Sequence, residues 1–86
     1  MSRYYLKIEH YPLAEDYRVS AEFHYGFDRR VGYFYQVYLP RHNTPLEEKG
    51  AWRRELTGAQ LLAHIDALNA PVPQHHRNAI ARDQPF

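Results

Sequence analysis

The 86-residue chain is long enough for one domain covering residues 1–86, and its 44% apolar and 24% charged residues are typical of a globular sequence. It has no cysteine, which excludes disulfides, thiolate metal sites and cysteine nucleophiles, and its formal charge of +1 provides no general attraction for phosphate. No stretch approaches the ~18 apolar residues of a membrane span, and no signal-like segment begins the chain. We therefore expect a cytoplasmic protein without a membrane partner.

Residues 4–11 alternate between two faces and predict the first strand. The side chains predicted to share one face are Tyr4, Leu6, Ile8 and His10. Tyr11 falls on the opposite face. Pro12 lacks a backbone donor and is predicted to end the strand, so residues 13–16 are interpreted as a loop or a single helical turn.

Residues 17–25 give the clearest alternation in the chain and predict a second strand. The side chains predicted to point into the core are Val19, Ala21, Phe23 and Tyr25. Gly26 and Asp28 then separate this strand from the next strand-like run. This spacing predicts a hairpin loop of three to five residues, and hence two antiparallel neighbours.

Residues 31–39 predict a third strand that is apolar on both faces. One face carries Val31, Tyr33, Tyr35, Val37 and Leu39, and the other carries Gly32, Phe34, Gln36 and Tyr38. Such a strand is either central and covered on both sides, or has one face reserved for a partner. Pro40 is predicted to end it.

Residues 41–50 have no periodicity and are interpreted as an exposed loop, in which Glu47 and Glu48 keep the surface soluble. Residues 51–56 alternate weakly, with Trp52 among the larger side chains. They are interpreted as a short fourth strand.

Two helices are predicted after this sheet. Thr57 and Gln60 have the spacing of a capping box, and Asn69 can end the helix in the left-handed conformation. The apolar stripe between them consists of Leu61, Leu62, Ile65 and Leu68. Pro73 is predicted as the first residue of a weaker helix that reaches residue 82 and docks mainly through Ile80 and Phe86. The polar side chains expected to be largely exposed there are His75, His76, Arg77 and Arg82.

The predicted fold class is therefore α+β: a three- or four-stranded antiparallel sheet with one amphipathic helix packed on one face and a short C-terminal helix.

Catalytic and metal-binding patterns are not found. Two histidines at positions i and i+4 of a helix would converge on a metal, whereas His75 and His76 are neighbours and point in different directions. Ser20 has no elbow glycines around it, and Thr57 is better used as a helix cap. We therefore expect no enzyme activity, no metal and no cofactor.

Nucleic-acid binding is an alternative. The four glycines do not form a phosphate-binding loop, but Arg29 and Arg30 precede Tyr33, Phe34 and Tyr35. Basic residues among sheet aromatics are how several single-strand readers stack bases. No Gly-Phe-Gly run of the RNA-recognition type is present, and the charge of +1 would leave affinity for phosphate weak.

Protein binding is the preferred interpretation. Eight Tyr, four Phe and one Trp exceed what two short helices can cover, so some rings are expected to meet a partner. Tyr, Trp and Arg are also the residue types enriched at interface hot spots. The expected partner-binding residues are Arg29, Arg30, Phe34, Tyr38, Trp52 and Arg53. Self-association of the same aromatic face into a homo-oligomer is a third possibility.

Small, cysteine-free α+β chains of this kind are typical of accessory proteins of phages and plasmids. That group includes inhibitors of host defence complexes such as anti-CRISPR proteins, and this chain resembles them in type. The resemblance transfers no functional residue. It suggests an inhibitor of a host complex.

Overall fold

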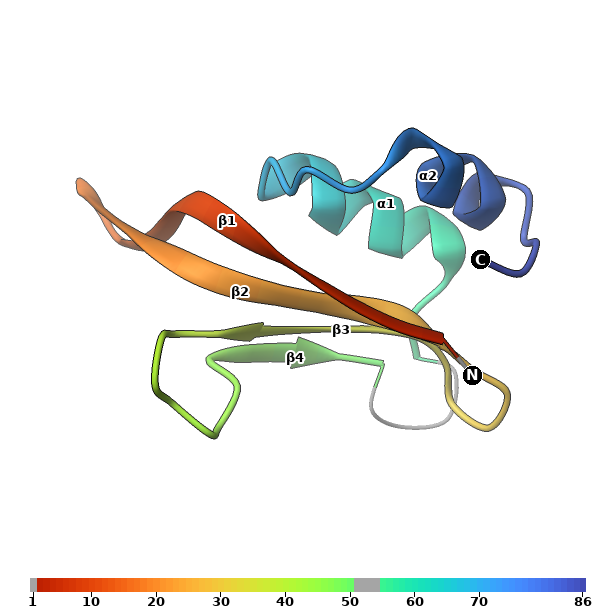
Figure 1. The fold of residues 1–86 in the computed structure, drawn as a ribbon, viewed down its shortest axis with the longest axis horizontal. Helices are drawn as coiled ribbons and strands as arrows, with labels where there is room; N and C mark the ends of the chain where they lie inside the picture. Colours follow the sequence, from red (N-terminus) through yellow and green to blue (C-terminus); the bar gives the residue numbers. More distant parts are fainter. Residues whose placement is uncertain (1, 51–54) are drawn as a thin grey trace.

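The computed structural model describes residues 2–50 and 55–86 of the chain. Its elements in these ranges are β1 (Ser2–Ala14), β2 (Tyr17–Asp28), β3 (Gly32–Tyr38), β4 (Glu47–Lys49), α1 (Gly58–Ala67) and α2 (Gln74–Ala81). The strands form one antiparallel sheet in the order β1-β2-β3-β4, and the two helices lie together on one side of it (Figure 1). The predicted α+β fold is confirmed.

β1 runs further than the sequence predicts, because it contains a bulge. Ile8 pairs with Ala21 and Tyr11 pairs with Val19, so β1 has one residue more than β2 over this interval. The extra residue changes the phase of the alternation. Tyr11 is therefore buried on the same face as Ile8, whereas His10 is exposed, which reverses the prediction for both.

Pro12 does not end the strand. β1 lies at the edge of the sheet, where a residue without a backbone donor is tolerated, and the strand continues to Ala14. Ala14 pairs with Tyr17, and a two-residue turn joins the strands in place of the predicted longer connection. Asp16 closes this turn with a φ of 61°, a conformation that aspartate adopts more readily than most residues.

β2 and β3 pair as antiparallel neighbours as predicted, but β2 continues through Gly26 to Asp28, which the prediction placed in the hairpin loop, and Val31 lies in the loop and not in the strand. Asp28 pairs with Gly32, which leaves a three-residue loop at positions 29–31. The inward side chains of both strands form the centre of the core: Phe23, Tyr25, Tyr35 and Val37 are each 0 or 1% exposed. We call this helix-covered side the inner face of the sheet.

β4 corrects the prediction of an exposed loop. Glu47 pairs with Val37 and Glu48 pairs with Gln36, so the acidic pair adds a short strand at the sheet edge. Two glutamates give little sequence signal for a strand, and pairing with β3 decides the outcome. Residues 51–54 of the predicted fourth strand lie outside the described residues, and Glu55 and Leu56 are not in a strand.

α1 begins as predicted. The Thr57 hydroxyl accepts a hydrogen bond from the Gln60 amide at 3.1 Å, and the Gln60 side chain accepts one from the Thr57 amide at 2.8 Å. Leu61 and Ile65 are fully buried against the sheet. Asn69 follows the helix with a φ of 52°, the left-handed stop that the sequence predicts.

α2 docks more firmly than the sequence predicts. Pro73 is the N-cap and not the first helical residue, and Ile80 is 2% exposed as expected. The correction concerns His76, which is only 8% exposed because it inserts between aromatic side chains of the inner face. Its neighbour His75 is exposed, as predicted.

Candidate functional site

The face of the sheet opposite the helices carries the candidate site, and we call it the outer face. The pairing register places its side chains in rows that cross the strands. One row consists of Tyr5, His24, Gln36 and Glu48, the next of Lys7, Glu22 and Tyr38, and the third of Arg3, Gly26 and Phe34. The side chains of β2 that are predicted to point inward all lie on the inner face. The outer face carries both aromatic rings and charged side chains.

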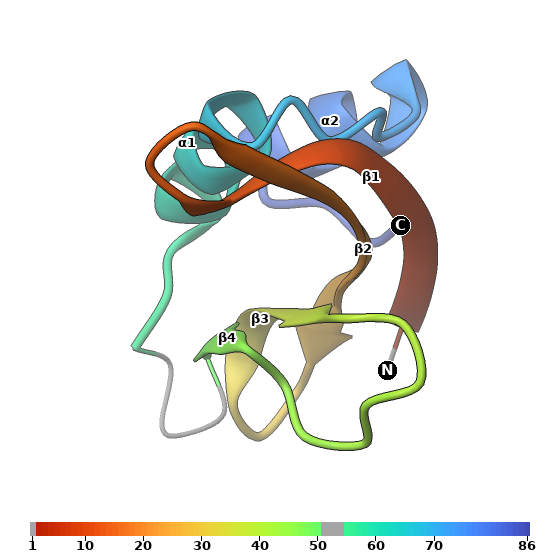
Figure 2. The ribbon, with the colours of Figure 1, turned by 90° about the vertical axis from the view of Figure 1, so that its left-hand side faces the viewer.

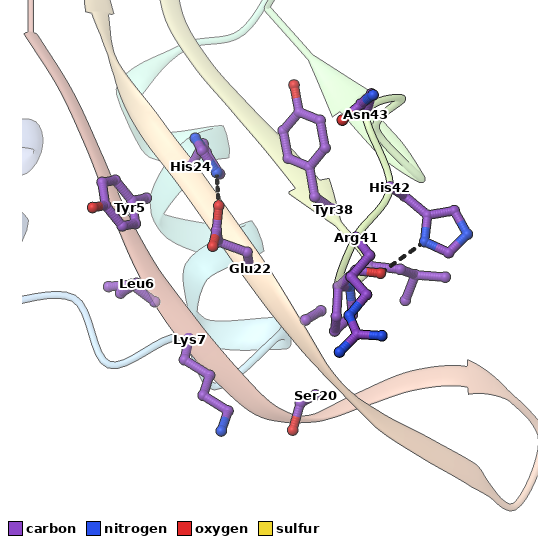
Figure 3. A pocket seen from close by; sticks show the side chains of 13 residues that line it. Tyr5, Leu6, Lys7, Ser20, Glu22, His24, Tyr38, Arg41, His42 and Asn43 are labelled. Carbon is purple, nitrogen blue, oxygen red and sulfur yellow. Dashed lines mark hydrogen bonds and ion pairs between the residues drawn. The ribbon is translucent and has the colours of Figure 1, made fainter.

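A groove follows this face where the β3–β4 connection lies beside the sheet. It has a volume of about 570 Å³, and Figure 3 shows the side chains that line it. Residues of β1, β2 and β3 form its floor, and Arg41 and His42 of the connection form part of its wall. We call it the outer groove. Tyr5 is its most exposed aromatic side chain, at 70%.

His24 lies at the centre of the floor and is held from four directions. Its Nε2 atom is 2.5 Å from the Glu22 carboxylate, and its Nδ1 atom is 3.0 Å from an Arg3 guanidinium nitrogen. The ring stacks on Tyr5 with centroids 5.5 Å apart, and it meets Tyr38 edge-on at 4.9 Å. The imidazole therefore has a fixed orientation.

The partners of His24 also define its tautomer. A guanidinium has no acceptor, so Nδ1 of His24 must accept from Arg3. Nε2 then carries the proton and donates it to Glu22. Both ring nitrogens are engaged in this arrangement, which leaves no free lone pair for general-base chemistry. The ring, whose side chain is 15% exposed, is a fixed support for the rings of Tyr5 and Tyr38.

Arg3 connects the edge strand to the centre of the sheet because Gly26 lies between them. Arg3 pairs with Gly26, which pairs with Phe34, and the missing side chain lets the guanidinium lie over the Phe34 ring at 5.5 Å. Arg3 also donates to Gln36 at 2.7 Å, and Gln36 donates to Glu48 at 2.8 Å. A polar chain thus crosses the outer face from β1 to β4.

Of the six residues predicted to bind a partner, the four that the structure describes are not brought together. Tyr38 is half-buried in the floor of the outer groove, and Phe34 is 8% exposed beneath Arg3, so the Phe34 ring offers little surface. Arg29 and Arg30 lie in the β2–β3 loop, where the Arg30 side chain is 90% exposed and 3.8 Å from Asp28.

The other two, Trp52 and Arg53, lie outside the described residues. Sequence reasoning missed Tyr5, His24 and Arg3. The available signal was the alternation of the first two strands, which assigns Tyr5 and His24 to faces away from the core. Placing them side by side additionally needs the length of the β1–β2 turn, which Pro12 obscured.

Most of the described aromatic side chains are buried in the core or packed against it. The large apolar side chains that remain exposed in the described ranges are Tyr5, Leu13, Tyr17 and Leu46. Among the described residues, the expected surplus of rings therefore reduces to two tyrosines, at 70% for Tyr5 and 57% for Tyr17. Of these, Tyr5 lies in a groove, and Tyr17 lies beside the β1–β2 turn.

A second polar cluster lies on the inner face. Glu47 accepts hydrogen bonds from the Tyr11 hydroxyl at 2.7 Å and from the Tyr35 hydroxyl at 2.5 Å. Burial, with the hydrogen bond to Glu47, raises the pKa of the Tyr35 hydroxyl far above its usual range. His64 is 3.2 Å from the same hydroxyl. The Tyr35 side chain is completely buried, so these contacts hold its hydroxyl at the edge of the core.

Two further features concern metal binding and membrane crossing. No group of three or more His, Asp or Glu side chains there is arranged to hold a metal ion. Within residues 2–50 and 55–86, neither helix has the length and apolar character needed to cross a bilayer.

No protein-family model matches the chain, and comparison with curated proteins and with solved structures gives no significant match. Function must therefore be inferred from the geometry of the chain's own residues.

Proposed function

We propose that the chain is a non-enzymatic protein-binding module and that the outer groove is its docking surface. The observation that carries this proposal is the state of Tyr5: the ring is 70% exposed, yet it stacks on a histidine that is held in one orientation. An exposed ring that is already ordered loses little conformational entropy on binding. Preordered aromatic side chains are typical of interface hot spots.

The charges of the groove favour a protein over a polyanion. Lys7 and Arg41 line the groove together with the carboxylate of Glu22, and Glu48 lies on the same face. Carboxylates repel a phosphate backbone, whereas a protein surface of mixed charge can pair with both signs. We propose a partner that presents an apolar or aromatic side chain to Tyr5, flanked by groups of both charges.

We further propose that the module acts in the cytoplasm as an inhibitor of a host complex, by occupying a surface that the complex needs. Occupation requires a rigid surface and no catalytic group. Both ring nitrogens of His24 are already hydrogen-bonded to Arg3 and Glu22, which supports a module that binds and does not catalyse.

Single-stranded nucleic acid is the second candidate, and one observation favours it. The rings of Tyr5, His24 and Tyr38 come from three adjacent strands and contact one another in sequence. Sheet aromatics in such a row can stack successive bases. Binding of a single-stranded oligonucleotide that weakens steeply with added salt would favour this candidate. No binding at low salt would eliminate it.

The experiment compares two exposed tyrosines of the same chain. Immobilised wild-type protein, Tyr5→Ala and Tyr17→Ala are incubated with lysate of the native host, and retained proteins are quantified by mass spectrometry. We expect a partner that wild type and Tyr17→Ala retain and that Tyr5→Ala loses. A hot-spot ring contributes about 2 kcal/mol or more, which corresponds to roughly 30-fold weaker binding.

Tyr38→Ala serves as an independent second test of the groove, and circular dichroism confirms that each variant is folded. Equal retention by wild type, Tyr5→Ala and Tyr38→Ala would contradict the outer groove as the docking surface.

A further inference from the structure

β1 has a free edge that is regular over its first half. Its pairs with β2 are one-to-one from Ser2 to Ile8, and the first bulge follows Ile8. In the described sheet β1 pairs with β2 alone, so its other side carries unpaired backbone donors and acceptors (Figure 2). An exposed edge of this kind is a template for another strand.

We propose that this edge pairs with β1 of a second copy, forming a two-fold antiparallel dimer centred on Leu6. In such a pair each residue opposes one of the second copy on the same face of the sheet. The centre at Leu6 then places Tyr5 opposite Lys7, Tyr4 opposite Ile8 and Arg3 opposite Glu9. Every opposed pair in this register is attractive or apolar.

Other symmetric registers are less favourable. Centring the pair on Tyr5 would oppose Arg3 with Lys7, and centring it on Lys7 would oppose two ammonium groups. A centre at Tyr4 shortens the pairing to Ser2–Leu6 and includes no opposite charges. A centre at Ile8 would place half of the pairing in the bulge that follows it, whereas a centre at Leu6 reaches the bulge only at its last pair, Arg3 with Glu9. Charge and backbone regularity thus select the same centre.

The side chains that would meet are accessible. The Lys7 and Glu9 side chains are 66% and 70% exposed and form a long ion pair with each other, at 3.9 Å. Tyr5 is 70% exposed, so its ring can receive the ammonium group of Lys7 from the second copy in a cation–π contact. Arg3 has five donors, and hydrogen bonds to His24 and Gln36 leave capacity for a carboxylate.

The geometry also limits the assembly to two chains. Beyond Ile8 the bulges of β1 interrupt a regular ladder, and at the opposite edge of the sheet β4 has three residues. A two-fold pair uses the β1 edge of both copies and is therefore closed. Both outer faces would lie on one side of the joined sheet, which would bring the two outer grooves next to each other.

The absence of cysteine makes single-cysteine crosslinking a direct test of this register. Leu6→Cys would face its counterpart across the two-fold axis, within the α-carbon separation that a disulfide requires. Tyr4→Cys is the control, because its two copies would lie roughly 14 Å apart at about 3.4 Å per residue. Under mild oxidation we expect a covalent dimer for Leu6→Cys and none for Tyr4→Cys.

Leu6 packs against the core, so a second variant avoids dependence on its folding. In the double variant Tyr5→Cys/Lys7→Cys both positions are exposed and face each other twice across the proposed interface. We expect a covalent dimer here as well, and a wild-type mass of twice 10.3 kDa by light scattering at high protein concentration.

A mass of 10.3 kDa at the highest concentration, with no crosslink in either variant, would overturn the dimer. Equal crosslinking of Tyr4→Cys would overturn the register. Neither result tests the outer groove, because Tyr38 of β3 lies outside the proposed dimer interface and Tyr38→Ala tests the groove against a different protein.

Discussion

At the scale of single residues, two positions organise the faces of the sheet. Gly26 lies on the outer face of β2, between β1 and β3: a Cβ there would lie 2.0 Å from the Ser2 carbonyl oxygen and 2.9 Å from the Phe34 ring. Glu47 joins strands on the inner face, where its carboxylate accepts hydrogen bonds from the hydroxyls of Tyr11 and Tyr35. Neither role depends on hydrophobicity.

Glu47→Ala is expected to destabilise the protein by about 2–4 kcal/mol, because two largely buried tyrosine hydroxyls would lose a charged acceptor. The matched control is Glu48→Ala, which removes an exposed carboxylate whose partner is Gln36. We expect the control to change stability by less than about 1 kcal/mol. Urea unfolding at neutral pH measures both, and equal losses would contradict a special role for Glu47.

At the scale of elements, α2 is attached to the sheet through an aromatic cluster around His76. The ring contacts Tyr4 of β1 with centroids 4.3 Å apart, and Tyr25 of β2 and Phe86 of the C-terminal segment also lie against it. The Tyr25 hydroxyl is 2.7 Å from Nδ1 of the histidine. The neighbouring His75 ring is 4.3 Å away and is the one titratable group of α2 in ring contact with it.

This attachment is expected to weaken in mild acid. Burial, and then the charge of His75, lowers the pKa of His76 from its ordinary value. The unfolded chain binds the proton first, so the stability is complete above about pH 6.5 and decreases as the pH falls below that value. Denaturant titrations at pH 7.5, 6 and 5 measure the decrease.

His76→Gln should show a smaller decrease over the same range, because the amide does not titrate and can still accept from Tyr25. His10→Gln is the control for an exposed histidine and should behave as wild type. An unchanged pH dependence in His76→Gln would assign the effect to other groups.

At the scale of the whole molecule, hydrogen bonds of tyrosines join elements that are distant in the sequence. Tyr11 of β1 reaches Glu47 of β4, so the two edge strands are linked across the inner face of a curved sheet (Figure 2). Tyr33 of β3 donates to Asp83, which follows α2, at 2.6 Å. In the described ranges no buried side-chain nitrogen or oxygen lacks a partner.

Alkaline unfolding is expected to be cooperative. Burial raises the pKa of Tyr11, Tyr25 and Tyr33 to about 12, whereas an unfolded tyrosine ionises near 10. The unfolded chain therefore loses these protons first, and stability decreases between about pH 10 and 12. The part of the tyrosinate absorbance that comes from these buried tyrosines should change together with the circular dichroism in that range. Ionisation of all tyrosines before any loss of secondary structure would contradict this expectation.

Local rules of the sequence determined a large part of the structure. The alternation of residues 17–25 defined which side of β2 is buried, and the Thr57 and Gln60 pair defined where α1 begins. These features depend on periodicity and on hydrogen bonds over three residues, which the sequence contains in full. They also fixed the α+β class.

Only the tertiary structure decided the positions of Tyr11, His76 and Glu47. A bulge rotated Tyr11 inward, aromatic neighbours from other elements buried His76, and pairing with β3 turned Glu47 from a predicted loop residue into a strand residue. The outer groove depended on the same kind of information. Tyr5 and His24 become neighbours through strand register, and register is fixed by turns and long-range packing that no local pattern encodes.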